Sequence, residues 1–139
     1  MIRKHAAWIA IGALVVIIVI GVVAFGNTTP EDDAGTGIPP QDPGLVAAGA
    51  PLYQANCASC HGEDLRGTSK GPSHLSIIYE PNHHGDMAFV LAAKNGVQAH
   101  HWRFGNMEPV PGLSDEDLAA IVAYVRSIQR EEGFEPYPP

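Results

Sequence analysis

The sequence predicts an all-α chain, in which one N-terminal transmembrane helix precedes a small helical domain. An uninterrupted apolar run predicts the transmembrane helix, helical spacing of apolar residues begins near residue 44, and a capped amphipathic segment follows Ser114. We therefore divide the chain into an N-terminus (1–5), an anchor (6–25), a flexible linker (26–43), a helical domain (44–131) and a proline-rich tail (132–139).

Charge is distributed unevenly along the 139 residues, whose formal net charge is −7. Residues 27–139 contain all 15 acidic residues but only six of the eight lysines and arginines, which leaves that part with a charge of −9. Such a surface repels nucleic acid and anionic lipid, so we expect no nucleic-acid binding. It favours a protein partner that has a basic docking surface.

The apolar run of residues 6–25 contains no charged residue. At about 1.5 Å per residue a helix of this length spans about 30 Å, the thickness of the hydrocarbon core of a bilayer. A cleaved signal peptide is the alternative, because the run ends in small residues near Ala24. The apolar part of a signal peptide, however, is usually only about 7–15 residues long. Arg3 and Lys4 predict a cytoplasmic N-terminus. We expect a single-pass anchor in the cytoplasmic membrane, with the rest of the chain on the outer, periplasmic side.

The segment 26–43 is rich in proline, glycine and acidic residues, and Ile38 is its one large apolar side chain. Such a composition does not bury enough apolar surface to fold alone. We interpret it as a flexible tether. The alternative is a segment that becomes ordered against a partner subunit.

Helical patterns in the domain begin at Gly44, where Val46, Gly49 and Tyr53 share one face. Pro51 predicts a kink or a later start. After a loop-rich region, a second helix is expected from Asp86. That helix would end at Gly96. Its apolar face would contain Met87, Val90 and Leu91.

The last helix has the strongest signals of the domain. Ser114 is a predicted N-cap, and Asp115 to Asp117 follow at the positive end of the helix dipole. Arg126 and Arg130 lie near the C-terminus, where cations are favoured. An apolar stripe predicts its buried face: Leu118, Ile121, Val122, Val125 and Ile128.

Residues 57–61 read Cys-Ala-Ser-Cys-His, the C-x-x-C-H spacing by which haem c is attached covalently. Cys57 and Cys60 would form thioether bonds with the two vinyl groups, and His61 would reach the iron from the same side. The alternatives are a Cys57–Cys60 disulfide, a redox dithiol or half of a zinc site. The histidine that follows directly favours one covalent haem.

A helix that leads into C-x-x-C-H, a glycine-rich middle and a methionine before a capped last helix together resemble class I cytochrome c, over about residues 43–131. The resemblance implies that fold, with Gly49 and Tyr53 crossing the last helix near Tyr124. It implies thioethers at the two cysteines, His61 as proximal iron ligand and haem attachment on the outer side of the membrane.

The resemblance also implies that the Pro72 carbonyl accepts a hydrogen bond from the proximal imidazole, and that Met107 is the distal iron ligand. Two departures affect the local packing of the haem. The family often has leucine two residues after the proline, where this chain has His74 followed by Leu75. It often has proline directly after the methionine, where this chain has Glu108.

Met107 is favoured as distal ligand because it lies on a loop, whereas Met87 is expected in the core. His100 or His101 is the rival ligand and would give a lower potential. The histidine pairs His83–His84 and His100–His101 could also bind copper or zinc together. Trp102 and Arg103 are candidates to contact the haem propionates, and packing against the haem is the alternative for Trp102.

These features predict a membrane-tethered electron carrier rather than an enzyme, because no nucleophile or acid–base pair is recognisable. Its expected partners are redox complexes such as a quinol-oxidising complex, a terminal oxidase or a photosynthetic reaction centre, and lipid would contact residues 6–25. The alternatives are a fixed haem subunit of a respiratory or photosynthetic complex and a haem-based ligand sensor.

Overall fold

The computed structural model of the protein describes residues 35–136. These contain four α-helices and one 3-10 helix: α2 (Pro43–Asn56), α3 (Ala58–His61), η1 (Ile77–Tyr79), α4 (Asp86–Asn95) and α5 (Asp115–Glu132). Within the described residues, β-type pairing is limited to two isolated bridges, Ser76 with Glu135 and Val97 with Met107. The all-α prediction is confirmed for the described part of the chain.

Among residues 35–136, no helix is both long enough and apolar enough to cross a bilayer. The anchor predicted at residues 6–25 lies outside the described residues.

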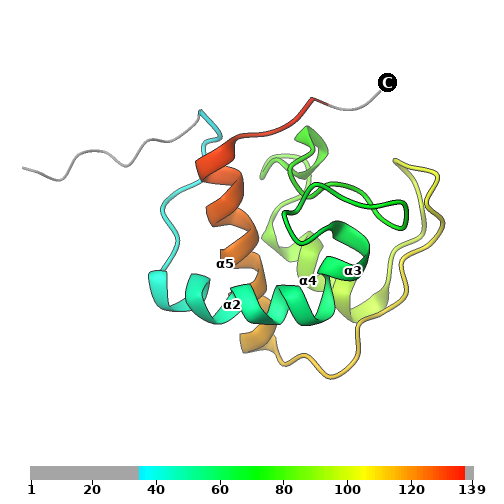
Figure 1. Cartoon of the computed structure of the whole chain (residues 1–139), viewed down its shortest axis with the longest axis horizontal. Coiled ribbons are helices and arrows are strands. Elements are labelled where there is room, and N and C mark those ends of the chain that lie inside the picture. The colour runs from blue at the N-terminus through cyan, green and yellow to red at the C-terminus, as the bar shows by residue number, and fades with distance from the viewer. Residues whose placement is uncertain (1–34, 137–139) are drawn as a thin grey trace, which may run out of the picture. The chain divides into compact units, whose positions relative to one another are not determined.

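Helix α2 crosses α5, and the two helices make the principal contact of the domain (Figure 1). Gly49 lies at the crossing: a Cβ atom added there would be 1.9 Å from the Ala120 carbonyl oxygen and 2.9 Å from Tyr124 Cβ. The buried Tyr53 ring lies 5.5 Å from the Tyr124 ring, between centroids. Only glycine allows the two backbones to approach this closely.

Local signals determine where both helices begin. The Asp42 side chain accepts a hydrogen bond from the Leu45 amide, and α2 begins at Pro43, so Pro51 does not mark a later start. Ser114 and Asp117 form a reciprocal capping box at the start of α5. The predicted apolar stripe of α5 supplies Ile121 and Val125 to the core.

Ile38 is 2% exposed, and its carbonyl accepts a hydrogen bond of 3.0 Å from the Arg130 side chain. The chain is thus held against the domain from this residue onward. The tether stays a prediction for the part of 26–43 that precedes it.

Arg126 lies in the C-terminal half of the last helix, as expected, but nothing in the sequence indicated that its side chain is buried. Its side chain is 1% exposed, and it donates hydrogen bonds of 2.6–2.7 Å to four acceptors: Asp86 Oδ1, the Tyr79 carbonyl, Gln129 Oε1 and the His84 carbonyl. One buried guanidinium therefore joins α5 to η1, to the turn before α4 and to the start of α4.

Candidate haem-binding site

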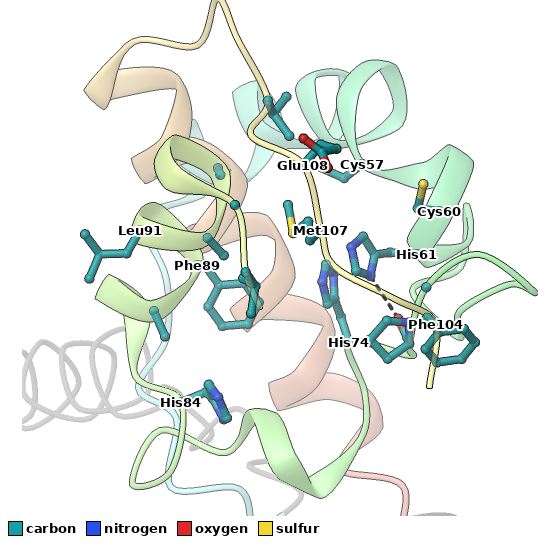
Figure 2. Close-up of a pocket in the computed structure, with 18 of the residues that line it drawn as sticks. Cys57, Cys60, His61, His74, His84, Phe89, Leu91, Phe104, Met107 and Glu108 are labelled. Atoms are coloured by element: carbon teal, nitrogen blue, oxygen red, sulfur yellow. Dashed lines mark hydrogen bonds between the residues drawn. The ribbon is translucent and has the colours of Figure 1, made fainter. Parts of the chain in front are cut away.

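A cavity of about 630 Å³ opens between the helices and the long loops (Figure 2). Its lining combines the C-x-x-C-H motif with apolar side chains of α4 and α5, among them Phe89, Ile121 and Val125. The size lies within the range of cofactor sites, and a mostly apolar lining with few polar groups is typical of them.

Cys57 joins α2 to α3, and its carbonyl accepts the amides of both Cys60 and His61. This tight turn places both sulfur atoms and the imidazole on the same cavity. The two cysteines are free thiols, not a disulfide. Burial, followed by the charge of Cys60, raises the pKa of Cys57 to about 11. A redox dithiol needs a reactive thiolate, which this shift disfavours at Cys57.

His61 is buried, and its Nδ1 atom lies 2.9 Å from the Pro72 carbonyl oxygen. A carbonyl only accepts, so Nδ1 carries the proton and Nε2 keeps its lone pair. Burial lowers the pKa of His61, and the Pro72 hydrogen bond partly opposes this effect. The imidazole is therefore neutral and oriented, as a metal-ligating histidine requires.

The segment after the motif folds back onto it. Thr68 donates its hydroxyl to the Cys60 carbonyl, and the Gly67 amide donates to the His61 carbonyl. A Cβ atom at Gly71 would lie 3.0 Å from the Cys60 carbonyl oxygen. This close backbone contact brings Pro72 within reach of His61.

His74 was not singled out for a structural role from the sequence. Its ring stacks on that of His61 with centroids 4.0 Å apart, and its Nδ1 atom is buried without a hydrogen-bond partner. Burial, then the His61 and Arg126 charges, holds the pKa of His74 well below its ordinary value. Leu75 instead turns into the core. In the sequence, the only sign that histidine takes the position where the family often has leucine was the order Pro-Ser-His-Leu.

Met107 lines the cavity from the loop opposite the motif (Figure 2). Its backbone forms a two-bond bridge with Val97, at 2.9 Å for each bond. Gly96 ends α4 with φ of +72°, and a Cβ atom there would lie 2.4 Å from the Met107 carbonyl. Met87 is 63% exposed, so its expected place in the core is wrong. It points outward because α4 directs Phe89 toward the core.

The remaining candidates lie in the loop that leads to Met107. Trp102 lines the cavity and stacks on Tyr79, with centroids 5.7 Å apart. His100 and His101 line the cavity too. Arg103 is exposed and does not line it. The propionate roles of Trp102 and Arg103 stay predictions.

The sequence model of the cytochrome c family matches residues 46–129, which contain the motif, the cavity and the α2–α5 crossing. The chain belongs to the cytochrome c family. The predicted resemblance to class I mono-haem cytochrome c is confirmed, and the cavity, the motif and the oriented His61 fit one covalently bound haem c.

Relatives include proteins named as cytochromes c and a subunit of an oxidase. Cytochrome c-551 of Bacillus subtilis is 32% identical over 70% of this chain and 73% of its own. Cytochrome c-554(547) of Halothiobacillus neapolitanus is 30% identical over 62% of this chain and 99% of its own. Cbb3-type cytochrome c oxidase subunit CcoP of Rhodobacter capsulatus is 30% identical over 64% of this chain, which spans only 31% of that subunit. No solved structure matches significantly.

Proposed function

We propose that this cytochrome c is a membrane-tethered carrier of single electrons on the outer face of the cytoplasmic membrane. The observation that carries the proposal is that an oriented His61 and Met107 line the same cavity beside the two cysteines. If His61 and Met107 both ligate the iron, no position would be left open for substrate, which favours electron transfer over catalysis or ligand sensing. Residues 6–25 would form the single-pass anchor, because of their apolar length.

Cys57 and Cys60 would hold the haem through thioethers, and His61 and Met107 would be the two ligands of its iron. When bound, the haem supplies a one-electron couple at its iron. The Pro72 hydrogen bond increases the basicity of His61, and the sulfur of Met107 favours the ferrous state. The apolar cavity walls exclude water and thereby tune the potential further.

The mouth of the cavity is the proposed docking face. Leu91 and Phe104 line the cavity and are 50% and 44% exposed, and Met87 is exposed on the same helix as Leu91. Apolar side chains at the mouth suit brief contact with a redox partner. The net negative charge of the chain steers basic partner surfaces, and association then slows as salt rises.

A terminal oxidase is the proposed acceptor, because relatives are named as subunits of a cbb3-type cytochrome c oxidase. The same relatives favour a second candidate, in which this chain is a fixed haem subunit of a larger complex.

Native electrophoresis of mildly solubilised membranes distinguishes these two candidates. A tethered carrier is expected in the membrane fraction and in a small haem-stained band of its own, since its only link to the membrane would be its anchor. Co-migration of all the haem stain with a large complex would establish the fixed subunit instead. Haem in the soluble fraction would contradict the anchor.

Replacing Met107 with alanine is expected to remove the far-red sulfur-to-iron charge-transfer band of the ferric protein and to lower its midpoint potential, since the thioether ligand is lost. Optical spectra and a redox titration measure both effects. Met87→Ala is the matched control, because Met87 is exposed and does not line the cavity. A band that persists in the Met107 variant would exclude Met107 as distal ligand.

A further inference from the structure

Four histidines that the haem site does not require lie on two segments near the cavity. His83 and His84 occupy the turn before α4, where both of their amides donate to the Glu80 carbonyl. His100 and His101 lie in the loop that the Val97–Met107 bridge closes. Fifteen residues, 85–99, lie between the two pairs in the sequence, and the fold brings the pairs together.

The ring nitrogens of three of these residues converge. His83, His84 and His101 each offer one ligand nitrogen, and the three atoms lie within 4.8 Å of one another. The Nε2 atoms of His83 and His101 are 3.3 Å apart. Two nitrogens bound to one tetrahedral zinc ion at about 2.0–2.1 Å lie about 3.3–3.4 Å apart, so this pair already has the spacing of zinc ligands.

One N–H···N hydrogen bond would explain why His83 lies close to His101, but it does not explain why the His84 imidazole lies close to both. The Nδ1 atom of His84 is 2.8 Å from the Ile78 carbonyl, which only accepts. The proton is therefore on Nδ1, and the Nε2 lone pair is directed away from that bond. A carbonyl that accepts a hydrogen bond from the other ring nitrogen in this way orients metal-ligating histidines.

The donor atoms of the cluster suit a transition metal. Neutral imidazoles bind zinc and copper and discriminate against calcium and magnesium, which prefer oxygen ligands.

Contacts outside the cluster hold both segments in place. Trp102 stacks on Tyr79, which fixes the loop beside His101. The buried Arg126 donates to the His84 carbonyl at 2.7 Å, which fixes the turn. Ligands that are positioned before binding lose little conformational entropy when a metal binds.

We propose that His83, His84 and His101 form a binding site for one divalent transition metal of the zinc class, separate from the haem iron. Three imidazoles leave one coordination position to solvent or to a partner. The bound metal would pin the loop that leads to Met107 onto the turn before α4.

Calorimetric titration of the full-length ferric holoprotein with zinc chloride tests the proposal. One zinc ion per chain is expected, with an unchanged Soret band. His83→Gln and His101→Gln are each expected to weaken binding by more than about tenfold, since each removes one of three ligands. The matched controls His100→Gln and His5→Gln should stay within about threefold.

Copper(II) supplies a readout that does not depend on the variants. The electron paramagnetic resonance spectrum of the copper-loaded protein is expected to show coupling to several equivalent nitrogens. Absence of stoichiometric zinc binding, equal zinc affinity in the His83 and His101 variants, or a zinc-induced Soret shift would each overturn the proposal.

Discussion

Replacing Gly49 with alanine is expected to destabilise the cytochrome c domain by about 3 kcal/mol. The added methyl group would occupy space 1.9 Å from the Ala120 carbonyl oxygen and 2.5 Å from its carbonyl carbon. These are backbone atoms of α5, so no side-chain rotation relieves the overlap. The two helices must separate, and the Tyr53–Tyr124 contact beside the crossing is then lost.

The experiment compares the free energy of unfolding of holoprotein variants in urea, followed by helical circular dichroism. Gly44→Ala is the matched control, because it lies in the same helix and meets only the side chain of Asp42. That variant is expected within about 1 kcal/mol of the parent, since helix propensity offsets the minor contact. Equal stability of the Gly49 variant would show that the helices do not cross at this residue.

Replacing Arg126 with methionine is expected to cost about 3–5 kcal/mol, even though methionine keeps an unbranched apolar stem. The guanidinium is the hydrogen-bond donor to the carbonyls of Tyr79 and His84 and to Gln129. Its loss leaves these acceptors without their donor in a buried place. Tyr79 and His84 line the haem cavity, so the change also loosens the cavity wall.

Arg66→Met provides the comparison for Arg126. Arg66 forms ion pairs with Glu132 and Glu135, but all three side chains are substantially exposed. Exposed ion pairs contribute about 0–1 kcal/mol, so this variant is expected to unfold close to the parent. The same urea titration measures both variants. A similar small loss for both would contradict the structural role of the buried arginine.

Several features of the domain were predictable because their causes are local in sequence. The C-x-x-C-H spacing specifies covalent haem within five residues, since thiols and imidazole must be close in the chain to reach one cofactor. Ser114 and the acidic residues after it specify the start of α5, because capping involves only the first turn. The buried face of that helix was likewise predictable, because its apolar residues recur with the period of an α-helix.

Other features depend on contacts between distant segments. A single arginine in a helical pattern gives no sign that three of its four acceptors will come from η1, α4 and the turn between them, so the sequence predicted only a cation near the end of the helix. Met87 and Phe89 have similar apolar character, and only packing against α5 and the core selected Phe89 as the inward residue.

The sequence by itself determined the cofactor, the family and the helices that have their own caps and periods, because each of these is encoded within a few neighbouring residues. The tertiary structure alone decided that His74 rather than Leu75 stacks on His61, and that His83 meets His101. The physical reason is that loop side chains follow no period. Their neighbours are determined by the helices on which the loops rest and by buried hydrogen bonds such as those of Arg126.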